Sequence, residues 1–167
     1  KFDWGVSDKL FLGQNVLDIF SQRLPATVIV NLYSIIFAIP IGIALGVFAA
    51  LKKNTWVDYL ISTLTMVVIS VPSFVYAFLI QYIFSYKLGW LPFLMKAGTD
   101  WFSPAMFVSM LPAIMSLAFG TIAGFTRTTR AELTEVLTSE FMLLARTKGL
   151  TKAQATVRHA LRNCFVV

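Results

Sequence analysis

The stretch Leu24–Leu51, LPATVIVNLYSIIFAIPIGIALGVFAAL, is 28 residues long and has no charged side chain. An α-helix rises about 1.5 Å per residue and the hydrocarbon core of a bilayer is about 30 Å thick, so about 20 apolar residues are enough to cross it. Buried helices of small soluble domains are shorter and keep a polar face. The stretch therefore predicts a membrane span at about residues 25–51.

The composition of the whole chain agrees with a membrane protein. Hydrophobic residues make up 57% of the 167 residues and charged residues 13%, against about 45–50% and about 25% in average soluble domains. Two more apolar stretches predict spans at about 59–86 and 104–125. The expected fold class is all-α, a polytopic helical membrane bundle that forms a single domain over residues 1–167.

Prolines and glycines lie inside the expected spans. Pro25 suits the first helical position, where proline loses no hydrogen bond, and Pro40 with Gly42 predicts a kink. Gly42 and Gly46 lie close to one helical face, which favours close approach of another helix, although chance placement of small residues is the alternative. In the second span, proline within residues 70–73, SVPS, frees a backbone carbonyl that the neighbouring hydroxyls can satisfy.

Basic residues orient the bundle. The first loop contains Lys52 and Lys53, and segment 127–163 carries seven of the 14 Lys and Arg residues. Three alternating spans put these two regions on one side, and the positive-inside rule makes that side cytoplasmic and places residues 1–23 outside. Trp90 and Trp101 flank spans and are expected to be interfacial anchors.

Polar side chains within the expected spans are candidates for lining a translocation path. A polar group that faces lipid is costly, so most of these side chains should face protein or water. Hydrogen bonding between helices is the alternative for each of them. The candidates are Asn31, Ser70, Ser73, Gln81, Ser109 and Ser116. No acidic or basic residue lies at the centre of a span, which argues against a proton-coupled carrier.

Residue types that carry catalysis or bind metals are scarce. His159 is the one histidine and Cys164 the one cysteine, which excludes an internal disulfide and any Cys-rich metal site. The sequence contains no glycine-rich phosphate loop that ends in Lys-Ser or Lys-Thr. We therefore expect a chain that is not an enzyme and that binds neither a metal nor a cofactor itself.

Segment 127–163 predicts two short helices joined by a glycine turn. Ala131–Lys148 lacks Gly and Pro, and its apolar residues recur at helical spacing. Gly149 is suited to ending that helix in a left-handed turn, and Thr151 can cap a helix from Lys152 to about Asn163. A short helix that projects from a membrane bundle can dock into a groove on a soluble partner.

The same segment resembles a known family. Residues 140–150, EFMLLARTKGL, and 158–163, RHALRN, are similar to the cytoplasmic loop of binding-protein-dependent ABC importer permeases, in particular those for oligopeptides, dipeptides and nickel. FDWG at 2–5, RLPAT at 23–27 and LGWLP at 88–92 resemble the first of the two permease subunits of that subgroup. Two positions depart from the pattern, Leu144 where the broader family often has alanine and Val167 roughly where the subgroup has proline.

The resemblance implies a type I ABC importer permease with a cytoplasmic coupling helix after the glycine turn, in a bacterial or archaeal cell membrane. It implies a second homologous permease, two ATP-binding subunits that use ATP and Mg, and an extracytoplasmic peptide-binding protein, and it implies no nucleic acid. It also implies further spans before Lys1 and after Val167. The residues that it places at the ATPase contact are Ala145, Arg146, Lys148, Gly149, Leu150, Thr151 and Lys152.

The leading hypothesis is thus the membrane-spanning subunit of an ATP-driven oligopeptide importer, with hydrolysis in the partner subunits. A nickel or other small-solute permease of the same family is an alternative, because span residues set the substrate. A membrane scaffold that recruits a partner without transport is a second alternative. Nucleic-acid binding by the basic segment is disfavoured, since its helices lack interleaved aromatic residues.

Overall fold

The computed structural model describes residues 4–9, 11–96, 98, 100–140 and 142. Its elements are the α-helices α1 (Val16–Leu51), α2 (Trp56–Ser70), α3 (Ser73–Ile80) and α4 (Pro104–Thr138), and the π-helix η1 (Gln81–Lys87). Among the described residues, α1 and α4 are each long and apolar enough to cross a membrane, and α2 with α3–η1 adds a third crossing if that bent pair is one span. The expected all-α membrane fold is confirmed.

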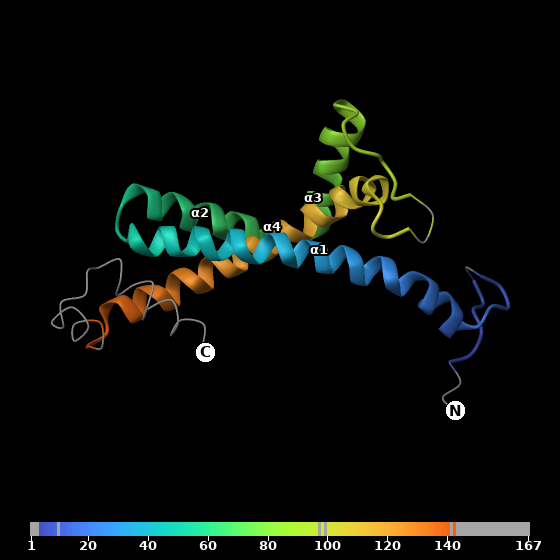
Figure 1. Cartoon of the computed structure of the whole chain (residues 1–167), viewed down its shortest axis with the longest axis horizontal. Coiled ribbons are helices and arrows are strands. Elements are labelled where there is room, and N and C mark those ends of the chain that lie inside the picture. The colour runs from blue at the N-terminus through green and yellow to red at the C-terminus, as the bar shows by residue number, and fades with distance from the viewer. Residues whose placement is uncertain (1–3, 10, 97, 99, 141, 143–167) are drawn as a thin grey trace.

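Helix α1 begins well before the start that the sequence suggested. The side chain of Asn15 accepts a hydrogen bond from the Leu17 backbone N–H at 3.1 Å, and Asp18 lies in the first turn, where a negative charge complements the helix dipole. Pro25 therefore lies inside α1 and does not start it. The helix also continues through Pro40 as one element, gently curved in Figure 1.

The second expected span is broken at Pro72, where α2 and α3–η1 meet at 96°. Pro72 has no N–H to donate to the Val68 carbonyl. That carbonyl accepts a hydrogen bond from the Tyr76 hydroxyl at 3.0 Å and a longer one from the Val71 backbone N–H at 3.4 Å, while the Ser70 hydroxyl donates to the Met66 carbonyl at 2.8 Å. The predicted disturbance at this proline is confirmed and is sharper than a kink, and the compensating hydroxyl belongs to Tyr76.

Helix α4 begins at a cap and continues past its expected end. The Ser103 hydroxyl accepts a hydrogen bond from the Met106 N–H at 3.3 Å, which caps the N-terminus. The helix runs to Thr138, so the arginines after Phe125 do not close it and no separate helix begins at Ala131. The reason is local, because residues 125–138 contain neither glycine nor proline and nothing interrupts the backbone hydrogen bonds.

Helices α1 and α4 pack side by side and run in the same direction. Near their starts, Val30 of α1 packs with Met106, Met110 and Ile114 of α4. Towards their ends, Ala50 of α1 clusters with Leu133, and with Met142 beyond α4. Helix α2 returns beside the second half of α1, and α3 projects away from the long helices (Figure 1). The ends of α1 and α4 therefore lie on one side of the molecule.

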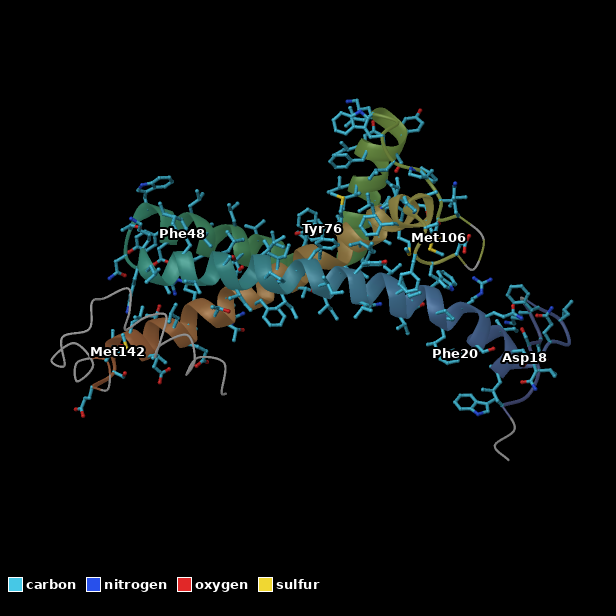
Figure 2. All side chains as sticks on the ribbon, viewed as in Figure 1. Asp18, Phe20, Phe48, Tyr76, Met106 and Met142 are labelled. Carbon is cyan, nitrogen blue, oxygen red and sulfur yellow. The ribbon has the colours of Figure 1, made fainter. Side chains whose placement is uncertain are left out.

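Large apolar side chains cover much of the outer surface of the helices. Leu32, Ile36 and Phe48 of α1 are each about half exposed, and Figure 2 shows such side chains pointing outwards all along α1, α2 and α3. Monomeric proteins in water rarely expose so large an apolar surface. The surface is typical of helices that are solvated by lipid or by further helices.

A candidate transmission junction between helices 1, 2 and 4

Two glycines of α1 bring its backbone into direct contact with α4. A Cβ atom on Gly42 would lie 2.7 Å from the Phe125 Cβ and 2.8 Å from the Ile122 carbonyl oxygen. A Cβ atom on Gly46 would lie 2.6 Å from the Thr129 Cβ and 2.7 Å from the Thr126 carbonyl oxygen. No side chain fits in either place, so the predicted use of these small residues for close helix packing is confirmed.

A hydrogen bond from α4 reinforces this contact. The Thr126 hydroxyl lies 3.2 Å from the Gly42 carbonyl oxygen of α1 and 2.7 Å from the Ile122 carbonyl oxygen of its own helix. Its single hydrogen is therefore shared between two acceptors, one on each helix. Because Thr126 is buried, the bond is shielded from competing water. This link between the helices was not expected from the sequence.

The same stretch of α4 is joined to α2 by an ion pair. The Arg130 Nε donates to Asp58 Oδ1 at 2.5 Å, and its Nη2 donates to Asp58 Oδ2 at 2.8 Å. The Asp58 carboxylate also accepts from the Asn54 backbone N–H at 3.0 Å and from the Ser62 hydroxyl at 3.4 Å. This two-pronged geometry is the strongest that arginine and a carboxylate form.

The two partners of this pair differ in exposure. The Asp58 side chain is 1% exposed and that of Arg130 is 31% exposed. Asp58 also lies in the first turn of α2, where the helix dipole favours a negative charge. A buried carboxylate with four hydrogen-bond donors is well satisfied, whereas loss of its arginine would leave a buried unpaired charge at a cost of roughly 3–5 kcal/mol.

These contacts define what we call the junction: Gly42 and Gly46 of α1, Asp58 of α2, and Thr126, Thr129 and Arg130 of α4. It lies near the ends of α1 and α4, on the side to which the α1–α2 turn also belongs. Its single acid, Asp58, is paired with Arg130, and the Thr126 hydroxyl donates to backbone carbonyl oxygens. Its arrangement is therefore suited to holding three helices together.

Only weak signals in the sequence pointed to the polar part of this junction. Asp58 looked like an ordinary loop charge, and Arg130 like one of many positive charges beside a span. The available signal was that Arg130 follows Thr126 by one helical turn, and so lies beside the face that packs on α1. The second signal was Asp58 itself, a single acidic residue at the beginning of an apolar stretch.

The candidate path residues are placed by mostly local hydrogen bonds. The side chains of Asn31, Ser70 and Ser116 each donate to a carbonyl of their own helix, at 2.8 Å in every case. Such bonds satisfy a polar group without a partner helix. In the described part of the chain, no hydrogen bond joins any two of the six candidates, and their place in a translocation path stays a prediction.

Two of the other candidates, Gln81 and Ser109, contact the loop that follows η1. The Gln81 amide donates to the Phe93 carbonyl at 3.2 Å, and the Ser109 hydroxyl accepts from the Lys96 backbone N–H at 3.1 Å. These two side chains therefore anchor the loop to η1 and to α4. Ser73 is exposed in the first turn of α3. The groove between α1 and α4 is lined by apolar residues such as Phe37, Leu111 and Phe119.

The residues expected to contact an ATPase, from Ala145 to Lys152, lie outside the described residues, as do the glycine turn and the helix expected after it. What the structure describes is the approach to them. Helix α4 carries the chain from the membrane-length stretch to Thr138, and Met142 is buried against Ala50 and Leu133 beside the end of α1. The expected coupling segment thus follows directly from the helix that forms the junction.

An all-α bundle with membrane-length helices and an apolar exterior is a multi-pass membrane protein. Comparison with known families places this chain more narrowly. It matches the binding-protein-dependent transport system inner membrane components over residues 42–167, about three quarters of its length, and it belongs to that family.

Curated relatives agree with this assignment. The oligopeptide transport system permease protein OppB of Haemophilus influenzae is 35% identical over 162 residues, which cover 97% of this chain and 51% of that protein. OppB of Escherichia coli K12 is 37% identical over 161 residues, which cover 96% of this chain and 50% of that protein. The chain spans about half the length of the curated relatives that it matches.

Proposed function

We propose that this chain is part of the membrane-spanning subunit of an ATP-driven oligopeptide importer. The observation that carries the proposal is the 35% identity, over 97% of this chain, with a permease protein of an oligopeptide transport system. In this proposal the chain forms the translocation path together with a second homologous permease. Two ATP-binding subunits hydrolyse ATP, and an extracytoplasmic binding protein delivers the peptide.

The described fold supports a mechanical role for α4 in this proposal. The helix runs without interruption from its apolar stretch through Arg127 and Arg130 to Thr138. A continuous helix transmits movement better than two helices joined by a flexible link. In the proposed assembly, residues 145–152 dock on an ATPase subunit, and Arg146, Lys148 and Lys152 meet acidic or backbone acceptors there.

Peptide import is tested by uptake in cells that lack the gene for this chain. Cells that carry the intact gene should accumulate a radiolabelled tripeptide in an ATP-dependent manner, and cells that lack it should not. Uptake of ⁶³Ni²⁺ by the same two strains is the matched measurement for the alternative substrate class. If the gene restores nickel uptake and leaves peptide uptake at the level of the deletion strain, the peptide assignment is wrong.

The coupling role is tested at the glycine turn. We expect Gly149→Asp to abolish peptide uptake while the subunit still inserts into the membrane, because the acidic side chain would disturb the turn where the ATPase docks. A cysteine at Lys152, in a background with Cys164→Ser, should crosslink to an ATPase subunit. Normal uptake by the inserted Gly149→Asp variant would contradict the coupling role.

A further inference from the structure

The pair formed by Asp58 and Arg130 connects two regions that are 72 residues apart in the chain. Asp58 holds the α1–α2 turn as well as α4, because the same carboxylate accepts from the Asn54 backbone N–H at 3.0 Å. Arg130 lies on α4 eight residues before its end at Thr138. The Asp58 carboxylate therefore connects the α1–α2 turn, the start of α2 and the C-terminal part of α4.

Contacts with α1 on the neighbouring face of α4 also hold the helix at this place. The Gly46 backbone of α1 touches Thr126 and Thr129, and Leu133, one turn further, is fully buried in a cluster with Ala50. Helix α4 is thus held by backbone contact on one side and by a bidentate ion pair on another. Two contacts in different directions fix both the distance and the rotation of a helix.

We propose that Asp58 and Arg130 are positioning residues for coupling, which hold the end of α4 and the α1–α2 turn together as one rigid body. Movement imposed on the segment after α4 is then carried to α1 and α2 as well as along α4. The proposal rests on the proposed function for the source of that movement, namely nucleotide-driven closure of the ATPase subunits. It adds the route by which one docking segment moves three helices.

A purely structural role makes a different prediction from a positioning role. A pair that only stabilises the fold would, when weakened, lower the amount of assembled protein and leave the properties of the assembled fraction unchanged. A pair that positions α4 would, when weakened, leave an assembled complex in which ATP hydrolysis no longer responds to the binding protein. The test therefore compares geometry and coupling in the same assembled complex.

The experiment uses the complex purified with its partner subunits and reconstituted in lipid, with Cys164→Ser. Spin labels are attached to cysteines that replace Lys53, on the α1–α2 turn, and Glu135, on α4; both side chains are exposed, so the labels do not disturb packing. Distance distributions between the labels are recorded by electron paramagnetic resonance without nucleotide and after trapping with ATP and vanadate. ATP hydrolysis is measured with and without the binding protein.

In the labelled protein that keeps Asp58 and Arg130, we expect one narrow distribution of distances between the two labels. This distribution should be the same in both nucleotide states. Arg130→Gln should broaden or shift the distribution in the trapped state and lower the stimulation of ATP hydrolysis by about tenfold. Asp58→Asn should do the same, and the double variant should add little, because both changes remove one interaction. Arg127→Gln, which removes an exposed arginine from the same helix, is the control and should leave the distance unchanged.

Any one of three results would overturn the proposal. The first is a label distance that changes with nucleotide in the protein that keeps Asp58 and Arg130. The others are a label distance in Arg130→Gln equal to that in Arg127→Gln, or full stimulation of ATP hydrolysis in Arg130→Gln. If Arg130→Gln does not assemble, Arg130→Lys keeps the charge and should give an intermediate loss. The label distances require ATP and no peptide, so they decide the rigid-body proposal even if the complex imports a solute other than peptide.

Discussion

At the scale of single residues, the molecule compensates for proline with a side chain from the next helix. Pro72 leaves the Val68 carbonyl without its usual donor, and the Tyr76 hydroxyl fills that place at 3.0 Å. The Tyr76 ring packs on Phe119 of α4, with ring centroids 5.3 Å apart, and Figure 2 labels Tyr76 where α2, α3 and α4 meet. Tyr76 thus bridges the 96° corner and links it to α4.

The first prediction concerns this hydroxyl. We expect Tyr76→Phe to lower the free energy of unfolding by about 1 kcal/mol, because the Val68 carbonyl loses a donor while the ring contact remains. Tyr82→Phe is the matched control, since the Tyr82 ring stacks on Tyr86 and its hydroxyl makes no hydrogen bond among the described residues. Thermal unfolding of the two variants in detergent measures the difference. Equal stability would show that the corner does not depend on this bond.

At the scale of elements, the glycine contact between α1 and α4 decides how closely the two long helices pack. We expect Gly46→Ala to destabilise the protein by about 1–3 kcal/mol, since the added methyl group would meet α4 backbone as well as side chain and cannot be accommodated by a rotamer change. Gly120→Ala, on α4, is the control. A methyl group there meets nothing within 4 Å and favours the helix, so stability should be equal or slightly higher. The melting temperatures of both variants check this expectation.

The elements also show what the sequence could predict. The apolar stretches and the small-residue face depend on composition and local spacing, so the all-α fold and the close packing at Gly42 were predictable. The start of α1 was not predictable. Pro25 is a more conspicuous signal for a helix start than Asn15, yet the helix accommodates Pro25 in its interior. The 96° corner was seen only as a disturbance, since its angle depends on Tyr76 and on packing against α4.

The candidate site was less predictable than the fold. Asp58 and Arg130 are 72 residues apart, and no local pattern says that two such distant charges will meet. Polar residues within the spans do not by themselves reveal a site, because a serine or asparagine can form its hydrogen bond within its own helix. Asn31, Ser70 and Ser116 do so here.

At the scale of the whole molecule, the parallel course of α1 and α4 puts the α1–α2 turn and the end of α4 on one side. The proposed orientation makes this side cytoplasmic, and thiol labelling tests it. In a background with Cys164→Ser, a cysteine in place of Asp100 should react with a membrane-impermeant maleimide in intact spheroplasts. A cysteine in place of Lys53 should react only after the membrane is permeabilised. The reverse pattern would invert the proposed orientation and remove the basis of the coupling role.

The buried ion pair also has a consequence for how the protein is made. Synthesis at roughly 5–20 residues per second takes on the order of 4 to 15 seconds to extend the chain from Asp58 to Arg130, which lies 72 residues later. During that interval the carboxylate has no arginine, and an unpaired charge is expelled from a nonpolar medium. The start of α2 is therefore expected to stay at the membrane surface until α4 has been made, and its final position is set when Arg130 reaches it.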